Sequence, residues 1–478
     1  MHTPFVDRLL CVQLVAKWIE GARTIGDVSV CIERVHTDSR SVEVGDLFIA
    51  LQGERFDAHD FLEQVSQSGA SAAMVATGKA DSHLSCIEVP DTRIGLGQLA
   101  KGWRSQMHIP VIAVTGSNGK TTVTQMLASI LRCTYGDGAL ATQGNLNNEI
   151  GVPQTVLRLR KFHRAAVIEL GMNHPGEIAW LAEIAQPTVG LVINAQREHQ
   201  EFMASVEAVA QENGAVITAL PANGVAVFPA DDEYTPLWKK LVGARACLTF
   251  SMQASQQNTK MAEVTLVHAD WVGDHWLVDI KTPQGNLKTK LHCAGLHNVS
   301  NALATTAAAL AAGIDLQNIA QGLEKFESVK GRSRAYVVNI ASKKVTVVDD
   351  SYNANPDSVK AAIDLLSELP KPQMLVLGDM GEVGNLGPEF HREVGRYAEQ
   401  KGIDSVLCLG EQTAHTVQAC PTRAQHFSDI DALHLHLSHG LPMVASVLVK
   451  GSRFMKMERV LEAITKLSEQ HTQETTPC

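Results

Sequence analysis

A glycine-rich loop between an apolar run and a helical pattern is the segment with the clearest chemical meaning. The apolar run Val111–Val114 is followed by the residues TGSNGKTT, which end at Thr122, and apolar residues then recur at helical spacing. Glycines let backbone N–H groups approach phosphate oxygens, and a helix N-terminus favours anions. Lys120 can neutralise the β- and γ-phosphates of ATP, while the Thr121 hydroxyl can bind Mg²⁺. The loop predicts an ATP site made by Gly116, Ser117, Asn118, Gly119, Lys120, Thr121 and Thr122.

The loop is a shortened form of the common phosphate-binding pattern. That pattern, G-x-x-x-x-G-K-[ST], places a glycine where this chain has Val114. A turn that only happens to end in a lysine is the structural alternative. The apolar run before the loop and the helical pattern after it favour phosphate binding.

Three polar residues follow apolar runs, at points where a parallel sheet would present them to a ligand. Glu169 comes directly after Val167-Ile168 and could bind Mg²⁺ together with Thr121, unless it only caps the next helix. His199 follows another apolar run and could bind a second metal, or it is an ordinary surface histidine. Asp350 could bond ribose hydroxyls across a cleft between domains, or it is a solvated turn residue.

Asparagine is frequent in three segments, at residues 144–151, 295–301 and 351–356. Its amide both donates and accepts hydrogen bonds, which suits sugars, amides and adenine. Asparagine is also common in turns. Each segment is therefore a candidate binding site and equally a candidate turn.

The spacing of the apolar runs divides the chain into three α/β domains. A length of 478 residues exceeds one ordinary domain, and uninterrupted apolar runs are typical of buried parallel strands. We place the domains at residues 1–108, 109–328 and 329–478, with a doubly wound sheet in the second. The expected strands lie within residues 46–51, 72–76, 111–114, 165–168, 189–193, 225–228, 345–348, 374–377, 406–409 and 446–449.

The charge and the cysteine pattern exclude several classes of protein. The formal net charge of -10 argues against nucleic-acid binding, which needs a positive surface. The 9 cysteines are scattered and form no CxxC pair, which fits a reducing cytoplasm. No signal segment is evident, and the Ala/Leu-rich stretch Ala302–Ile314 is too short to span a bilayer. We expect a soluble cytoplasmic monomer without stable membrane insertion.

Taken together, these segments resemble the Mur ligase family over nearly the whole chain. Within the family, the likeness is to the branch that adds D-alanyl-D-alanine to UDP-N-acetylmuramoyl-tripeptide, and DDSYNANP and LGDMGEVG look specific to that branch. At residues 37–40 and 45–57, TDSR and GDLFIALQGERFD look like its site for the UDP-sugar peptide. The other matching motifs are TGSNGKTT, GNLNNEIGVPQT, VIELGMNHPGEI, GLHNVSNALA, KGRSRAY and KGSRFMKME.

The resemblance implies a fold and a reaction. The fold is a small N-terminal α/β module, a central P-loop ATPase-type doubly wound sheet and a C-terminal Rossmann-like domain that closes over ATP. The reaction belongs to cytoplasmic peptidoglycan precursor synthesis and uses ATP and Mg²⁺. ATP phosphorylates the tripeptide carboxylate, and the amine of D-alanyl-D-alanine attacks the acyl phosphate to give amide, ADP and phosphate.

The resemblance also implies roles for individual residues. Catalysis would depend on Lys120, Glu169 and His199, and the metal ligands would be Thr121, Glu169 and His199. Beyond the phosphate loop, the nucleotide would contact Asn298, Asn301, Arg332 and Asp350. The UDP-muramoyl ligand would contact Ser39, Arg40, Arg55, Phe56, Asn145 and Asn148, and the candidates for the amine site are Tyr352, Asn353 and Asn355.

Two departures from the family pattern concern the second metal. Relatives carry a carbamate-modified lysine on the helix after the histidine, where this chain has Asn213. The second metal would then be held differently, through Glu212 or water. The segment Asn194–His199 is also more charged than the glycine- and proline-containing version of the family.

Other functions are compatible with parts of the pattern. A small-molecule kinase would need only the phosphate loop and a hydroxyl acceptor. A nucleotide-sensing module would close its third domain on ATP without any chemistry. Among ligases, the rivals are the enzyme that adds the third amino acid and folate polyglutamylation, and the first is disfavoured because no DNPR-like signature occurs in the third domain.

Overall fold

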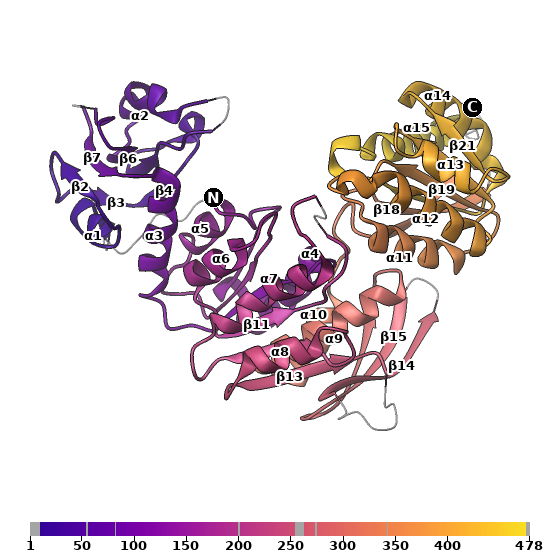
Figure 1. Cartoon of the computed structure of the whole chain (residues 1–478), viewed down its shortest axis with the longest axis horizontal. Coiled ribbons are helices and arrows are strands. Elements are labelled where there is room, and N and C mark those ends of the chain that lie inside the picture. The colour runs from indigo at the N-terminus through magenta and orange to yellow at the C-terminus, as the bar shows by residue number, and fades with distance from the viewer. Residues whose placement is uncertain are drawn as a thin grey trace.

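Three large β-sheets, of 5, 9 and 6 strands, follow one another along the described part of the chain (Figure 1). The computed structural model describes residues 10–53, 56–81, 83–198, 201–253, 262–272, 275–341 and 343–474. We call the parts built on these sheets the first, central and third domains. In Figure 1 they are coloured indigo, magenta to salmon, and orange to yellow.

The first domain is built on a five-stranded sheet of order β2-β7-β6-β5-β4, in which β2 is antiparallel and the other strands are parallel. Its strands are β2 (Arg23–Ile25), β4 (Arg34–His36), β5 (Asp46–Ile49), β6 (Ala72–Ala76) and β7 (Ser85–Val89), with a separate pair β1 (Leu10–Cys11) and β3 (Cys31–Ile32). Its helices are α1 (Val12–Lys17), η1 (Ser39–Ser41), η2 (Ala58–Phe61), α2 (Leu62–Gln67) and α3 (Thr92–Arg104).

The central domain is built on a nine-stranded sheet of order β16-β15-β14-β13-β12-β11-β8-β10-β9. Its strands are β8 (Val111–Thr115), β9 (Ala139–Ala141), β10 (Ala165–Glu169), β11 (Val189–Val192), β12 (Val225–Pro229), β13 (Ala246–Ser251), β14 (Val264–Val272), β15 (His275–Thr282) and β16 (Gly285–Leu291). Its helices are α4 (Lys120–Tyr135), η3 (Gly136–Gly138), α5 (Gly151–Val156), α6 (Glu177–Ala185), α7 (Val206–Thr218), α8 (Thr235–Val242), α9 (Leu296–Ala311) and α10 (Leu316–Glu324).

Strand β8 lies at the point where the order of the parallel strands reverses. It pairs in parallel with β10 on one side and with β11 on the other. In an open α/β sheet, the loops at the carboxyl ends of strands beside such a switch point form the ligand crevice. The residues after β8, β10 and β11 therefore meet at one place.

The third domain has a six-stranded sheet of order β17-β18-β22-β19-β20-β21, with only β17 antiparallel. Its strands are β17 (Arg334–Ile340), β18 (Lys343–Asp350), β19 (Gln373–Gly378), β20 (Ser405–Leu409), β21 (Ala424–Phe427) and β22 (Ser446–Lys450). Its helices are α11 (Pro356–Ser367), η4 (Gly384–Leu386), α12 (Gly387–Gln400), α13 (Ala414–Ala419), α14 (Ile430–Gly440), η5 (Leu441–Met443), η6 (Arg453–Met455) and α15 (Glu458–Glu474).

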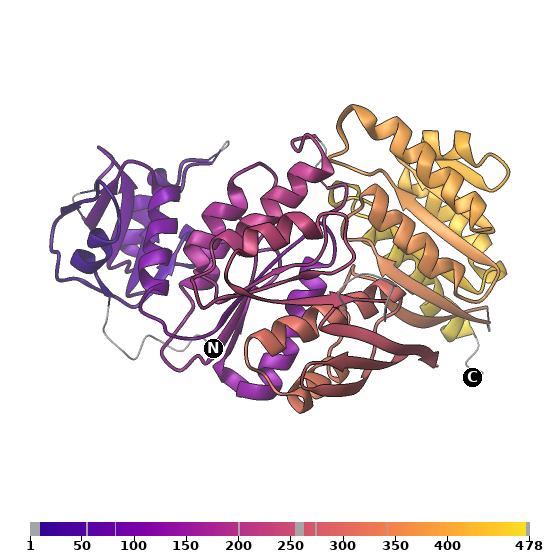
Figure 2. The ribbon, with the colours of Figure 1, turned by 60° about the horizontal axis from the view of Figure 1, so that its bottom comes forward.

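The first and central domains share an apolar core, whereas the third domain has separate cores. One continuous core contains side chains of the first domain, such as Leu99 and Trp103 of α3, together with side chains of the central domain, such as Leu181. Helix α3 packs directly against α5 and α6, and Figure 2 shows the first and central domains in contact along this helix. The third domain has two cores of its own, one on each face of its sheet, which include only Ala294 from outside it.

The expected strands are confirmed in all three domains, because each predicted apolar run lies in or overlaps a strand. The antiparallel strands β14 to β16 and β17 were not expected. They alternate apolar and polar residues, which differs from the continuous apolar runs of buried parallel strands. No helix in the described residues is long and apolar enough to cross a membrane.

Candidate active site

A cavity of about 760 Å³ lies between the central and third domains. Its walls come from the phosphate loop, from the segments that follow β10, β11 and β12, from the start of α9, and from the third-domain segments before β17 and after β18, β19 and β22. The volume is in the range of sites for nucleotide-sized ligands. Polar side chains dominate these walls, so the cavity suits a charged ligand.

The phosphate loop begins and ends on glycines that adopt positive φ angles. Gly116 follows β8 with φ +137°, and Gly119 precedes α4 with φ +89°. A Cβ on Gly119 would lie 2.5 Å from Oδ1 of Asn301, so the loop backbone approaches α9 more closely than any side chain would allow. Val114 is a fully buried residue of β8, which explains why the loop lacks the first glycine of the common pattern. The first residues of α4, Lys120 to Thr122, line the cavity, and the N–H groups in the first turn of a helix are free to bind an anion.

Lys120 is held by acceptors on both sides of the loop. Its Nζ donates to the carbonyl oxygens of Gly116 (2.6 Å) and Ser117 (3.2 Å) and forms an ion pair with the buried carboxylate of Glu198. Glu198 was not predicted as a site residue, and the only sequence signal for it is its place beside His199. A bound phosphate would compete with the Glu198 carboxylate for Lys120. The ion pair therefore indicates where the phosphate of a ligand would lie.

Glu169 is buried at the end of β10, with 2% of its surface exposed. Its Oε1 accepts hydrogen bonds from Thr121 Oγ1 (3.2 Å) and Asn147 Nδ2 (2.8 Å), while its Oε2 has no hydrogen-bond partner among the described residues. Glu169 does not cap a helix, so that alternative is wrong. A carboxylate with an unsatisfied buried oxygen beside a hydroxyl fits a hard cation such as Mg²⁺.

The second metal is not accounted for by the described side chains. His199, its expected ligand, lies outside the described residues. Glu212, the alternative to the lysine, accepts with its two oxygens from the backbone N–H groups of Gly176 and Ile178 at the start of α6 (both 2.8 Å). Asn213 is buried and accepts from Thr115 Oγ1 (2.5 Å). Within the described residues, no group of three or more His, Cys, Asp or Glu side chains could hold a metal.

Asn298 and Asn301, at the start of α9, line the cavity beside the phosphate loop. Both are buried and paired with each other, because Asn301 Nδ2 donates to Asn298 Oδ1 (3.0 Å). The cavity wall also contains Phe250 of β13 and Met252 just after it, and Asp231 accepts from Ser251 Oγ (2.7 Å). Sequence reasoning missed this wall, because its residues lie at or just after the ends of β12 and β13 without a recognisable motif.

The third domain contributes the cationic side chains of Arg332 and Lys450 to the cavity. Arg332 Nη2 donates to Thr121 Oγ1 (3.1 Å), and its guanidinium lies 4.1 Å from the centre of the Tyr352 ring. Asp350 is buried and forms an ion pair of 2.5 Å with Lys450, so the solvated-turn alternative is wrong. Lys450 was missed as a site residue. Lys450 ends β22 opposite Asp350 in the parallel pairing of β18 with β22, a register that only the folded chain shows.

Other predicted residues fall into two groups. Asn145, Asn148, Tyr352, Asn353 and Asn355 line the cavity together with the phosphate loop. Ser39, Arg40 and Phe56 belong to the first domain and do not line the cavity; Arg40 is exposed and paired with Asp38, and Phe56 is exposed. Arg55 lies outside the described residues.

Three models of protein families match the chain. They are described as "Mur ligase family, catalytic domain" at residues 32–104, "Mur ligase middle domain" at 114–309 and "Mur ligase, glutamate ligase domain" at 333–453. A relative from Escherichia coli (strain K12), "UDP-N-acetylmuramoyl-tripeptide--D-alanyl-D-alanine ligase", is 40% identical over 438 residues, which cover 91% of this chain and 94% of the relative. The chain belongs to the Mur ligase family. The Mur ligase fold also accounts for its three α/β domains.

Solved structures of Mur ligases match this arrangement over almost the whole chain. "Crystal structure I of MurF from Acinetobacter baumannii" has a TM-score of 0.88 at 33% identity and covers 98% of this chain and 99% of its own. The crystal structure of MurF ligase from Thermotoga maritima in complex with ADP has a TM-score of 0.80 at 27% identity, covering 91% and 98%. A Mur ligase similar to this chain therefore binds an adenine nucleotide.

Proposed function

We infer that this Mur ligase joins D-alanyl-D-alanine to the free carboxylate of UDP-N-acetylmuramoyl-tripeptide in peptidoglycan precursor synthesis, and that it uses ATP to form the amide bond. The likeness to ligases of that name extends over 91% of the chain at 40% identity. The observation that carries the inference is the cavity between the domains, where the phosphate loop, Glu169 and Arg332 lie together. Such a cavity can hold ATP against an acceptor carboxylate.

The reaction proceeds in two steps that need no covalent enzyme intermediate. In the first step, a carboxylate oxygen of the tripeptide attacks the γ-phosphorus of ATP, the bond from that phosphorus to the β-γ bridging oxygen breaks, and ADP leaves. In the second step, the dipeptide amine attacks the acyl carbon, a proton is lost, and the tetrahedral intermediate expels phosphate. Lys120 and Arg332 neutralise the transferring phosphoryl group, which is the main contribution a protein makes to phosphoryl transfer.

The residues around Glu169 suit one Mg²⁺. Thr121 and the unsatisfied Oε2 of Glu169 would hold it, with phosphate and water oxygens completing the set of ligands. When bound, the ion supplies charge neutralisation to the β- and γ-phosphate oxygens. His199 is proposed as a ligand of a second ion, and this chain has Asn213 at the position where the family resemblance expects a lysine.

The other substrates are assigned to the flanking domains. We place the UDP-muramoyl ligand on residues 1–108, with Ser39, Arg40, Arg55 and Phe56 as its contacts, and on Asn145 and Asn148. Residues 109–328 bind ATP, including its adenine near Asn298 and Asn301 and its ribose near Asp350 of the third domain. Residues 329–478 bind the amine, with Tyr352, Asn353 and Asn355 as candidates.

The test is phosphate release by the purified protein with ATP, Mg²⁺ and UDP-N-acetylmuramoyl-tripeptide, with and without D-alanyl-D-alanine. We expect release to depend on the dipeptide and to match the amide product mole for mole. D-Alanine alone and a diamino acid serve as control amines. Phosphate release that the dipeptide does not increase would refute the function, and transfer of phosphate to a hydroxyl would favour a kinase.

A further inference from the structure

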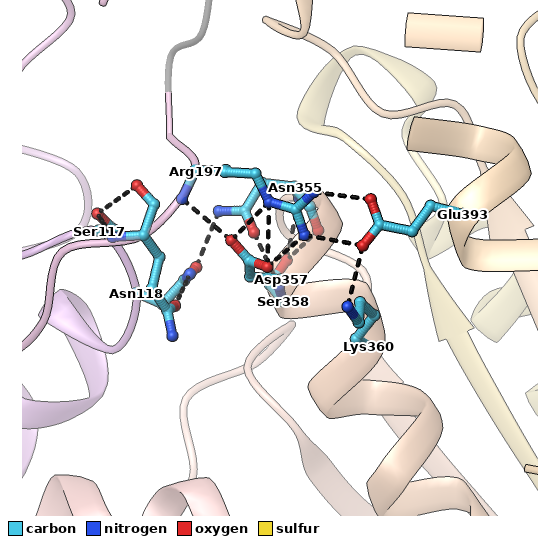
Figure 3. A network of polar contacts seen from close by, with 9 residues as sticks. Ser117, Asn118, Arg197, Asn355, Asp357, Ser358, Lys360 and Glu393 are labelled. Atoms are coloured by element: carbon cyan, nitrogen blue, oxygen red, sulfur yellow. Dashed lines mark hydrogen bonds and ion pairs between the residues drawn. The ribbon is translucent and has the colours of Figure 1, made fainter. Parts of the chain in front are cut away.

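A cluster of charged side chains joins the central domain to the third domain beside the cavity (Figure 3). Arg197 comes from the segment after β11, Asp357 and Lys360 come from α11, and Glu393 comes from α12. We call these four residues the Arg197 clasp. Its two positive and two negative side chains give it no net charge.

Arg197 is bound from three sides. Its Nη2 lies 2.5 Å from Oδ1 of Asp357 and its Nη1 lies 2.7 Å from Oε2 of Glu393. Its backbone N–H also donates to Asp357 Oδ2 (3.0 Å), and its guanidinium lies 5.2 Å from the centre of the Phe390 ring. Lys360 donates to the other oxygen of Glu393 (2.9 Å). Planar two-point contacts of this kind fix orientation as well as distance.

The pairing keeps the clasp charged at neutral pH. Hydrogen bonds from Arg197, and less strongly from Lys360, lower the pKa of Glu393 to about 2. The same carboxylates raise the pKa of Arg197. Because a lowered carboxylate pKa gives stabilisation that is lost only as the pH falls from the ordinary value of 4.5 toward about 2, the clasp is intact throughout the neutral range.

The residues on either side of Arg197 hold the phosphate loop. Ser117 Oγ donates to the carbonyl oxygen of Gln196 (3.1 Å) and accepts from its N–H (2.9 Å). Asn118 Nδ2 donates to Oε1 of Gln196 (2.6 Å), and Asn118 Oδ1 accepts from Asn355 Nδ2 in the third domain (3.0 Å), as Figure 3 shows in part. Glu198 is the residue that pairs with Lys120. A single short segment therefore contacts both the phosphate loop and the third domain.

Among the described residues, the third domain shares little apolar core with the central domain. Its apolar cores are its own apart from Ala294, whereas the first and central domains share a core. The described contacts of the third domain with the central domain at the cavity include the hydrogen bonds of Arg332 to Thr121 and of Ser333 to His297. Interfaces between domains that lack a large apolar area allow relative motion. The position of Arg332 at the phosphate loop thus depends on polar contacts.

We propose that Arg197 is a positioning residue, which locks the third domain in the closed arrangement and so aligns Arg332 and the amine site with the phosphate loop. Arg197 touches none of the reacting groups in this role. Its effect passes through Asp357 and Glu393 to α11 and α12, and through Gln196 to Ser117 and Asn118. The proposal rests on the ligase function proposed above, and it deepens that function by naming what holds the closed site together.

The first test measures closure without turnover. Small-angle X-ray scattering of the full chain with Mg²⁺ and a non-hydrolysable ATP analogue gives the radius of gyration of the wild type, Arg197→Ala, Arg197→Lys and Glu393→Gln. We expect Arg197→Ala to be the most expanded, with the two conservative variants between it and the wild type. Arg396→Ala is the matched control, because Arg396 lies on α12, as Glu393 does, but pairs with Glu389 of the same helix.

The second test separates the substrates by steady-state kinetics. We expect Arg197→Ala to lower kcat/KM for D-alanyl-D-alanine roughly 10-fold, as a coupling energy of ordinary size would do. The KM for the UDP-muramoyl-tripeptide should stay unchanged, because a shared core, which does not include Arg197, holds the first and central domains together. Arg197→Ala/Glu393→Gln should be no worse than Arg197→Ala, because the first substitution already breaks the pair.

Two results would overturn the proposal: a wild-type radius of gyration for Arg197→Ala, or a kcat/KM for D-alanyl-D-alanine that Arg197→Ala leaves unchanged. If Arg197→Ala does not fold, Glu393→Gln gives the same comparison, and wild-type scattering and kinetics for it would be a refutation as well. Failure of the ligase function has a different signature. The wild type would then release no dipeptide-dependent phosphate, while the scattering comparison would still report on the clasp.

Discussion

Glu169 combines burial, negative charge and an unsatisfied oxygen in one side chain. Burying a carboxylate oxygen without a partner costs stability, so such groups are kept where a ligand uses them. Thr121 and Asn147 fix the other oxygen and thereby orient the free one. The structure thus contains a preformed position for a cation beside the phosphate loop.

Replacing Glu169 with glutamine separates this role from a structural one. Glu169→Gln keeps the shape and removes the charge, so we expect kcat to fall roughly 1000-fold through loss of several kcal/mol of transition-state stabilisation. The midpoint of thermal unfolding without ligand should stay the same or rise, because a buried amide costs less than an unpaired carboxylate oxygen. Glu207→Gln, an exposed position on α7, is the control for both measurements. A Glu169→Gln enzyme with near-normal turnover would remove Glu169 from the metal site.

The residues of the site differ in how far sequence could predict them. Lys120, Thr121 and Glu169 could be found because each directly follows a recognisable strand or loop. Glu198 and Lys450 could not be singled out, because their partners Lys120 and Asp350 are 78 and 100 residues away and meet them only in the folded chain. Asp231 and Ser251 were missed because no recognisable motif surrounds them. Pairings at long sequence separation require the topology to be known first.

At the scale of elements, the junction of β8 and α4 determines how the loop is presented. The strand runs to Thr115 without interruption and the helix starts at Lys120, which leaves four residues to turn the chain. Gly119 makes this possible, because it combines a positive φ with a backbone position tight against Asn301. The turn therefore leaves space for a ligand but not for a side chain at residue 119.

We expect Gly119→Ala to abolish ATP binding while the three domains remain folded. Alanine would carry the strain of φ +89° and place its Cβ 2.5 Å from Asn301 Oδ1, so the loop must shift. The stability cost should be about 1–3 kcal/mol. Gly136→Ala is the matched control at the other end of α4, with φ +56° and no atom within 4 Å of the new Cβ. It should lose stability and keep its ATP affinity by isothermal titration calorimetry; equal affinities for both variants would contradict the role of Gly119.

The elements themselves were predicted unevenly. Parallel strands such as β8, β10 and β19 could be read from the sequence because they are buried on both faces and therefore continuously apolar. Strands β14 to β16 were not predicted, because one face of each is exposed and apolar residues alternate with polar ones. Over a few residues, such a mixture has the same composition as a loop. The division into first, central and third domains was anticipated, but the shared core of the first two was not, since it joins residues such as Leu99 and Leu181 across two sheets.

For the whole molecule, the distribution of cores predicts two cooperative units rather than three. The first and central domains share one core, so they should unfold together, while the third domain should unfold separately. Differential scanning calorimetry should resolve two transitions, and hydrogen exchange should assign α3 and β8 to the same one. If the amides of α3 exchanged with a much lower opening free energy than those of β8, the first domain would unfold separately from the central domain, which would contradict this prediction.

The central claim is that ATP activates the tripeptide carboxylate as an acyl phosphate. The most direct measurement uses UDP-N-acetylmuramoyl-tripeptide labelled with ¹⁸O in both oxygens of its reacting carboxylate, with ATP, Mg²⁺ and D-alanyl-D-alanine. Because the acyl carbon–oxygen bond breaks in the second step, we expect each released phosphate to carry one ¹⁸O atom and the amide product to keep the other. Unlabelled phosphate formed together with the amide would contradict the mechanism.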